Sequence, residues 1–141
     1  MTTTIARDPL TRHVADVMHR GILSCDRDAS LREVAQTMAE ERVHCVVVES
    51  GSGDAGPLWG VVSGLDLVAA ASVRGLGEQT AGGSAASPVV TIPVGETLER
   101  AAQLMTEHGT THIIVVGQAG LPVGVVSTLD IARALVAEDE A

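Results

Sequence analysis

The chain has 141 residues, 45% of them hydrophobic, and a formal net charge of −9 at pH 7. This length suits one domain or two very small halves, and the negative charge argues against binding to nucleic acid or to anionic membranes. With one Trp and no Phe or Tyr, the chain also lacks the aromatic platforms on which single-stranded nucleic acids stack. All nine basic residues are Arg, which excludes a P-loop lysine, a Schiff-base lysine and a lysine general base.

The cysteines and the N-terminal sequence indicate a reducing, cytoplasmic setting. Cys25 and Cys45 are too far apart for any paired metal-ligand spacing, and each lies in an apolar run, so we predict buried free thiols. The first residues do not form an export signal, and no apolar run approaches the length of about 18 residues that a membrane-spanning helix needs. Five His residues without paired spacing predict no metal site.

In chain order, a polar lead at residues 1–12 is followed by apolar spacing that predicts a short helix at 13–18. An extended piece is expected at 22–25. Ser30 then resembles a helix N-cap, because Glu33 at the third position after it completes a capping box before an apolar stripe of helical period.

Two β-branched runs follow in the first half. Residues 43–48 predict a buried strand and residues 58–63 the returning strand, joined by a Gly-rich hairpin loop at 50–57. A helix is expected at 67–73. The segment at 74–87 is rich in Gly, Ala and Ser, and we interpret it as a linker that stands in for a degenerate start of a second copy.

The same pattern then returns. Residues 88–92 predict an extended piece, Thr97 an N-cap, 112–116 a strand, and 131–137 a helix. The apolar helix face of the first copy recurs in the second at a constant offset: Leu31, Val34, Ala35 and Met38 correspond to Leu98, Ala101, Ala102 and Met105. A period of about 65 residues is too long for a solenoid and indicates a duplicated small domain with pseudo-two-fold symmetry.

One motif is nearly identical in the two copies. Gly-Val-Val-Ser-x-Leu-Asp occupies residues 60–66 and again residues 124–130. A single copy is most simply a capped helix start. Two copies favour a ligand site as well, because a helix N-terminus suits a phosphate and a fixed carboxylate suits a sugar diol.

This duplicated order resembles the CBS domain, named after cystathionine β-synthase, over about residues 13–137. The resemblance implies an α/β fold of the α+β type, in which tandem β-α-β-β-α repeats with pseudo-two-fold symmetry form one CBS-pair module. The repeats would span 13–73 and 88–137, with an acidic tail at 138–141. It also implies clefts near the pseudo-two-fold axis that hold AMP, ADP, ATP or S-adenosylmethionine.

The resemblance gives the motif residues their roles. Asp66 and Asp130 would bind the ribose hydroxyls, and Ser63 and Ser127 would lie near phosphate.

It also implicates residues of the short first strands. Ser24 and Thr91 would line the base or phosphate side, with Ile22 and Val89 against the base.

His44 and His112 would face phosphate, although a His in an apolar strand is more often a hydrogen-bonded structural residue. Residues 1–74 carry seven Arg and ten acidic residues, whereas residues 75–141 carry two and eight. Arg20 and Arg42 lie close in sequence to the first-copy site residues, so we expect Arg42 to bind phosphate and the first half to be the better nucleotide site.

The sequence therefore predicts a stand-alone regulatory module, an energy or metabolite sensor that binds an adenosine-containing ligand and requires no cofactor. The alternative is a ligand-free scaffold or dimerisation module. An enzyme is not expected, because the chain shows no nucleophile–base pair, lysine or metal cluster. We also expect a homodimer, since the Ala- and Val-rich helix faces at 68–71 and 132–136 exceed what one small core covers. The sequence does not identify a regulated protein partner.

Overall fold

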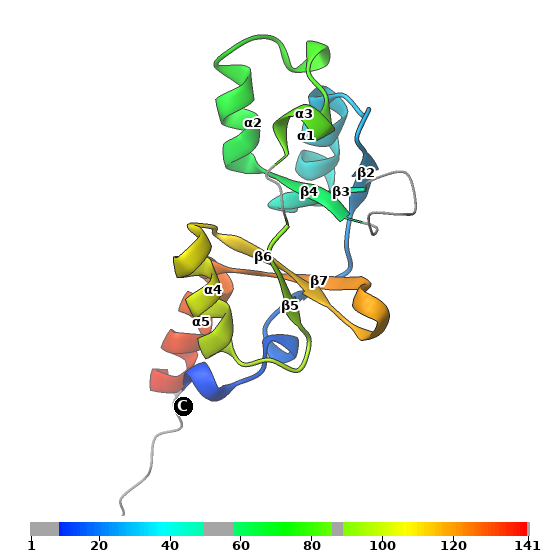
Figure 1. Ribbon diagram of the computed structural model, residues 1–141. Helices are drawn as coiled ribbons and strands as arrows, with labels where there is room; N and C mark the ends of the chain where they lie inside the picture. The colour runs from blue at the N-terminus through cyan, green and yellow to red at the C-terminus, as the bar shows by residue number, and fades with distance from the viewer. Residues whose placement is uncertain (1–8, 50–57, 86–88, 141) are drawn as a thin grey trace, which may run out of the picture. The chain divides into compact units, whose positions relative to one another are not determined.

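A computed structural model describes residues 9–49, 58–85 and 89–140. The chain forms two compact units, each a small sheet with helices packed on it (Figure 1). The first unit is Ile22–Val89, and the second unit is Met1–Gly21 together with Val90–Ala141. The two mixed sheets and their helices confirm the predicted fold class. The hairpin loop predicted at 50–57 lies outside the described residues.

The first unit contains a three-stranded sheet in the order β2-β3-β4. β2 (Ser24–Asp26) is parallel to β3 (Cys45–Glu49), which is antiparallel to β4 (Leu58–Ser63). Its helices are α1 (Leu31–Glu41), α2 (Gly64–Ala71), the 3-10 helix η4 (Leu76–Glu78) and α3 (Ala81–Ser84). Leu31 and Val34 of α1 pack with Val46, Val48 and Val62 in the core of this unit.

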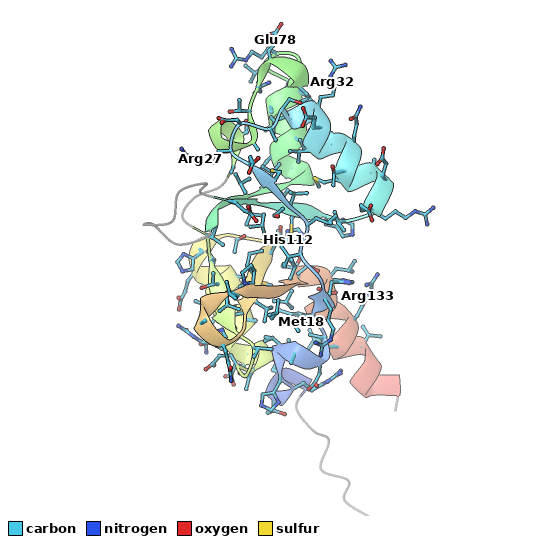
Figure 2. All side chains as sticks on the ribbon, turned by 90° about the vertical axis from the view of Figure 1, so that its right-hand side faces the viewer. Met18, Arg27, Arg32, Glu78, His112 and Arg133 are labelled. Carbon is cyan, nitrogen blue, oxygen red and sulfur yellow. The ribbon has the colours of Figure 1, made fainter. Side chains whose placement is uncertain are left out.

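The second unit contains a four-stranded sheet in the order β1-β7-β6-β5. β1 (His19–Arg20) is antiparallel to β7 (Pro122–Ser127), β7 is antiparallel to β6 (His112–Val116), and β6 is parallel to β5 (Thr91–Pro93). Its helices are η1 (Pro9–Thr11), η2 (Val14–Asp16), α4 (Leu98–His108), η5 (Gln118–Gly120) and α5 (Thr128–Glu140). Met18, labelled in Figure 2, belongs to the core of this unit.

The helix caps explain where the helices begin. The hydroxyl oxygens of Ser30 and Thr97 accept hydrogen bonds from the N–H groups of Glu33 and Arg100, at 3.2 Å in both cases, which confirms both predicted N-caps. The two helices predicted at 67–73 and 131–137 begin earlier, at Gly64 and Thr128. The first turn after a capping serine is already helical, because the cap satisfies its free N–H groups.

The segment at the start of each repeat packs with the helix and sheet of the other repeat. The N–H of Leu31 in α1 donates to the carbonyl oxygen of Gln79 at 2.9 Å, and the N–H of Leu98 in α4 donates to that of Arg12 at 2.8 Å. Leu98 is the repeat counterpart of Leu31, and Gln79 is that of Arg12 at the same offset. Residues 79–85, which lead into the second repeat, therefore pack in the first unit, and residues 12–18, at the start of the first repeat, pack in the second unit.

The segment predicted as a linker at 74–87 contains η4 and α3. Thr80 caps α3 by accepting from the N–H of Gly83 at 3.2 Å. The N–H of Gly82 donates to the carbonyl oxygen of Arg27 at 2.9 Å, and a Cβ at Gly82 would lie 3.0 Å from the Cβ of Arg27. Gly82, in the segment predicted as a linker, therefore allows a close approach to the backbone of Arg27. Figure 2 shows Arg32 of α1 and Glu78 of η4 at the same end of this unit.

None of the helices in the described part of the chain is both long enough and apolar enough to cross a membrane.

Candidate functional site

The first copy of the duplicated motif forms a reciprocal capping box at the start of α2. One carboxylate oxygen of Asp66, Oδ2, accepts from the Ser63 N–H at 2.8 Å and from the Ser63 hydroxyl at 3.0 Å. In return, the Asp66 N–H donates to the Ser63 hydroxyl oxygen at 3.3 Å. Within residues 9–49, 58–85 and 89–140, no hydrogen bond or ion pair reaches the other oxygen, Oδ1. Asp66 is half-buried.

The second copy repeats this geometry at the start of α5. Oδ2 of Asp130 accepts from the Ser127 N–H at 2.8 Å and from its hydroxyl at 3.0 Å, and the Asp130 N–H donates to the Ser127 hydroxyl at 3.2 Å. Both serines are thus N-caps, as predicted. Here Oδ1 has a partner as well, because Nε2 of His19 lies 2.8 Å away. Only 4% of the Asp130 side chain is exposed.

His19 contacts a predicted site residue, and its own place beside Asp130 was not predicted from the sequence. It lies near the start of the chain and Asp130 near its end, so no local spacing connects the two. One sequence difference between the copies could have pointed to His19. At the offset that relates Leu31 to Leu98, its counterpart is Ala86.

In the first unit, the structure brings several predicted site residues to one end of the sheet. Ser63 pairs with Cys45 across β4 and β3, and the N–H of Gly64 donates to the His44 carbonyl oxygen at 3.3 Å. Ser24 is level with Val47 in the parallel pair, which places Ile22 level with Cys45. Ile22, His44, Ser63 and Asp66 thus share one end of the sheet, whereas the exposed Ser24 lies further along it.

The second unit arranges its residues in the same way. His112 pairs with Ser127 across β6 and β7, and the N–H of Thr128 donates to the carbonyl oxygen of Thr111 at 3.0 Å. Thr91 is level with Ile114 in the parallel pair β5–β6, and Val89 lies just before this strand.

The imidazole of His112 has a local partner. Its Nδ1 lies 2.9 Å from the Thr111 hydroxyl. His112 is therefore a hydrogen-bonded strand residue, which was the alternative to a phosphate contact.

The charge asymmetry inferred from the two halves of the sequence is wrong for the compact units. Arg20 lies in β1, which belongs to the second unit. Counted by unit, Ile22–Val89 carries four Arg and nine acidic residues, whereas the other unit carries five and nine. The exchange of N-terminal segments thus nearly equalises the two charges. Arg42, the predicted phosphate ligand, is exposed at the C-cap of α1 and lies in the first unit.

Both cysteines are free thiols, and their environments differ. Burial raises the pKa of Cys45 to about 11. Burial, and then the negative charges of Asp26, Glu49 and Glu33, raise the pKa of the half-buried Cys25. The described residues contain no cluster of three or more His, Cys, Asp or Glu that could hold a metal ion.

The chain thus contains two sheets covered by helices. In each, a capping box stands where the last strand, β4 or β7, runs into a helix, which defines a duplicated α/β module. The sequence matches the CBS domain over residues 14–73 and 85–137. The chain belongs to the CBS domain family, of which it contains a tandem pair. No protein with a curated function matches it.

Solved structures of other CBS proteins share the fold. The CBS-domain-containing protein ATU1752 from Agrobacterium tumefaciens is 24% identical with a TM-score of 0.75, over 89% of this chain and 94% of that one. The CBS domain pair of protein MJ0100, in complex with 5′-methylthioadenosine and S-adenosyl-L-methionine, is 19% identical with a TM-score of 0.78, over 91% and 98%. The CBS domain of the bacterial CNNM/CorC family Mg2+ transporter, in complex with ATP, is 20% identical with a TM-score of 0.74, over 91% and 89%.

Proposed function

We propose that this CBS pair is a regulatory module that binds an adenosine-containing ligand, such as AMP, ADP, ATP or S-adenosylmethionine, and so reports energy or metabolite state. The observation that carries the proposal is the geometry of Asp66. The capping box fixes its carboxylate through Oδ2 and directs no donor of the described residues to Oδ1. A fixed, half-satisfied carboxylate at a helix N-terminus suits a ribose diol, with the phosphate near the helix N–H groups.

The neighbouring residues support this role. His44 and Ile22, one polar and one apolar residue, belong to the same end of the sheet as Ser63, whose hydroxyl contacts the Asp66 carboxylate. Two of the similar CBS structures hold adenosine derivatives or ATP. The chain would act by binding rather than by catalysis, in a reducing cytoplasmic setting that suits its two free thiols.

A thermal-shift experiment tests the proposal. AMP, ADP, ATP and S-adenosylmethionine are compared with 2′,3′-dideoxyadenosine 5′-monophosphate, which lacks both hydroxyls. A ligand at 100 times its Kd adds about 2.7 kcal/mol to the free energy of unfolding, which raises Tm by roughly 5–10 °C in a chain of this size. We expect at least one of the four ligands to do so and the dideoxy analogue to have little effect.

The matched variants are Asp66→Asn and Asp28→Asn. An Asn at position 66 still accepts from the Ser63 N–H but loses the charge that strengthens bonds to hydroxyls, so the ligand shift should shrink. Asp28 is an exposed carboxylate of the same unit, and its substitution should leave the shift unchanged. Absence of a shift with all four ligands, or an equal shift with the dideoxy analogue, would refute the proposal.

We also infer that the protein associates with a second copy of itself. The helices that follow the two capping boxes expose large apolar side chains: Leu65 and Val68 on α2, and Leu129, Leu135 and Val136 on α5. Leu65 and Leu129 occupy the same position in the two repeats. Because an isologous interface needs the same patch on both partners, a second copy satisfies these faces without any further protein.

A further inference from the structure

The two ribose-binding candidates differ in how much of each carboxylate is already in use. An ionised carboxylate offers about four acceptor positions. Asp66 accepts two hydrogen bonds from the described residues, both from Ser63. Asp130 accepts three, two from Ser127 and one from Nε2 of His19. A vicinal diol brings two donors, so it can be satisfied by Asp66 as it stands, whereas Asp130 has too few positions left.

The backbone holds His19 beside Asp130. His19 pairs with Val125 in the ladder of β1 and β7. The neighbouring Gly124 makes this approach possible, because a Cβ there would lie 2.7 Å from the His19 carbonyl oxygen and 2.8 Å from the sulfur of Met18. Met18 is itself buried in the core of this unit. The backbone of His19, from which the imidazole side chain extends, is thus held in a fixed position relative to the Asp130 carboxylate.

The imidazole of His19 has room to rotate away from Asp130. The His19 side chain is 63% exposed, while that of Asp130 is 4% exposed. Rotation about the side-chain torsions of His19 would place the ring in solvent and uncover Oδ1 of Asp130 without breaking the pairing of β1 with β7. The contact does not depend on whether the imidazole is charged, because Nε2–H can donate to the carboxylate in both the neutral and the protonated ring.

We propose that His19 decides which of the two aspartates accepts a ribose. It occupies Asp130, so the ligand binds through Asp66, and the second unit accepts a ligand only when the His19 side chain rotates away. This inference rests on the proposed function. At the offset that relates the two copies, the counterpart of His19 is Ala86, whose side chain carries no hydrogen-bond donor.

The ligand at the second unit must break a hydrogen bond to a charged group before it binds. Such bonds contribute enough that removing His19 should tighten binding at Asp130 about 10- to 100-fold. His19 is thus a specificity-determining residue that restricts each chain to one strong site.

Titration calorimetry with AMP, and in parallel with S-adenosylmethionine, tests this on the full chain. We expect one strong site per chain in the wild type, no strong site in Asp66→Asn, and two strong sites in His19→Ala. The decisive protein is the double variant Asp66→Asn, His19→Ala, which should regain one site because Asp130 is then open. His108→Ala removes another exposed imidazole of the same unit and should titrate as the wild type does.

The outcomes separate the two proposals. Two equivalent sites in the wild type, or a double variant that is folded by its melting curve yet binds neither ligand while the wild type binds one, would overturn the role of His19 and leave the proposed function standing. Binding of neither ligand by any of these proteins would overturn the proposed function and this inference with it.

Discussion

The N–H of Val14 donates to the carbonyl oxygen of Glu96 at 2.9 Å, and the Val14 side chain is fully buried in the core of the second unit. A residue at the start of the first repeat is therefore a core residue of the second unit. We expect Val14→Ala to lower the free energy of unfolding by about 2 kcal/mol, through lost burial and the cavity left behind. Chemical denaturation would measure the loss.

The control for this prediction is Val73→Ala, which removes the same atoms from an exposed side chain and should change stability by less than about 0.5 kcal/mol. Amide exchange should locate the Val14 effect in α4 and its neighbouring strands. Equal stability of the two variants would contradict the assignment of the N-terminal segment to this core.

Gly124→Ala should destabilise the protein by about 1–3 kcal/mol, as overpacking does in other close contacts. The added methyl group meets the backbone of His19 and the side chain of Met18, and β1 must shift to relieve it. Gly64→Ala is the matched substitution, at the first residue of α2 where a Cβ meets nothing within 4 Å. Alanine favours a helix over glycine, so this variant should be unchanged or slightly more stable in thermal melting.

Arg42→Gly should stabilise the fold and weaken phosphate binding at the same time. Arg42 has φ 57° and ψ 44°, a left-handed conformation that glycine adopts at lower cost, and its counterpart is Gly109 at φ 62°. We expect a gain of about 1 kcal/mol from Arg42→Gly and a similar loss from Gly109→Ala. If Arg42 is a phosphate ligand, Arg42→Gly also lowers the affinity for ATP more than that for adenosine. An unchanged ATP affinity would remove Arg42 from the site.

Cys45 should resist thiol reagents in the folded protein. With its pKa near 11, about one molecule in a thousand carries the reactive thiolate at pH 8. A colorimetric thiol assay should therefore detect slow reaction of the half-buried Cys25 and almost none of Cys45, and both should react in denaturant. A Cys25→Ala variant isolates the second thiol.

The raised pKa also makes stability depend on alkaline pH. The folded-state pKa of Cys45 exceeds its ordinary value of 9.0, so its contribution to stability is complete below pH 9 and is lost as the pH rises toward 11. Cys45→Ala should flatten this part of the pH profile. Rapid labelling of Cys45 at pH 8 under native conditions would contradict its burial.

Light scattering at tens of micromolar should give the mass of a dimer, in line with the apolar faces of α2 and α5. Val68→Glu or Leu135→Glu should shift the mass to that of a monomer, because a charge then faces the partner's apolar patch. Leu121→Glu places the same charge on another exposed leucine and should leave the dimer intact. A strictly monomeric wild type, with and without nucleotide, would exclude the interface.

Much of the fold could be read from local patterns. The strands at 58–63 and 112–116 and the caps at Ser30 and Thr97 follow from β-branched runs and from short polar residues before an apolar stripe. The exchange of N-terminal segments could not, because both 12–18 and 79–85 have the same spacing whichever sheet they join. Local spacing places Ser63 and Asp66 together, but it contains no information on His19, which reaches Asp130 through strand pairing.

The exchange of segments has a consequence for how such a chain could arise. In each unit, the N–H that begins the main helix finds its acceptor on residues that belong to the other copy of the repeat. In a polypeptide with a single copy, this segment would have to be supplied by a second molecule, so its folding would depend on protein concentration. Fusion of two copies places both segments and both helices on one chain. The effective concentration of each segment at its helix is then set by the connecting chain and not by the protein concentration.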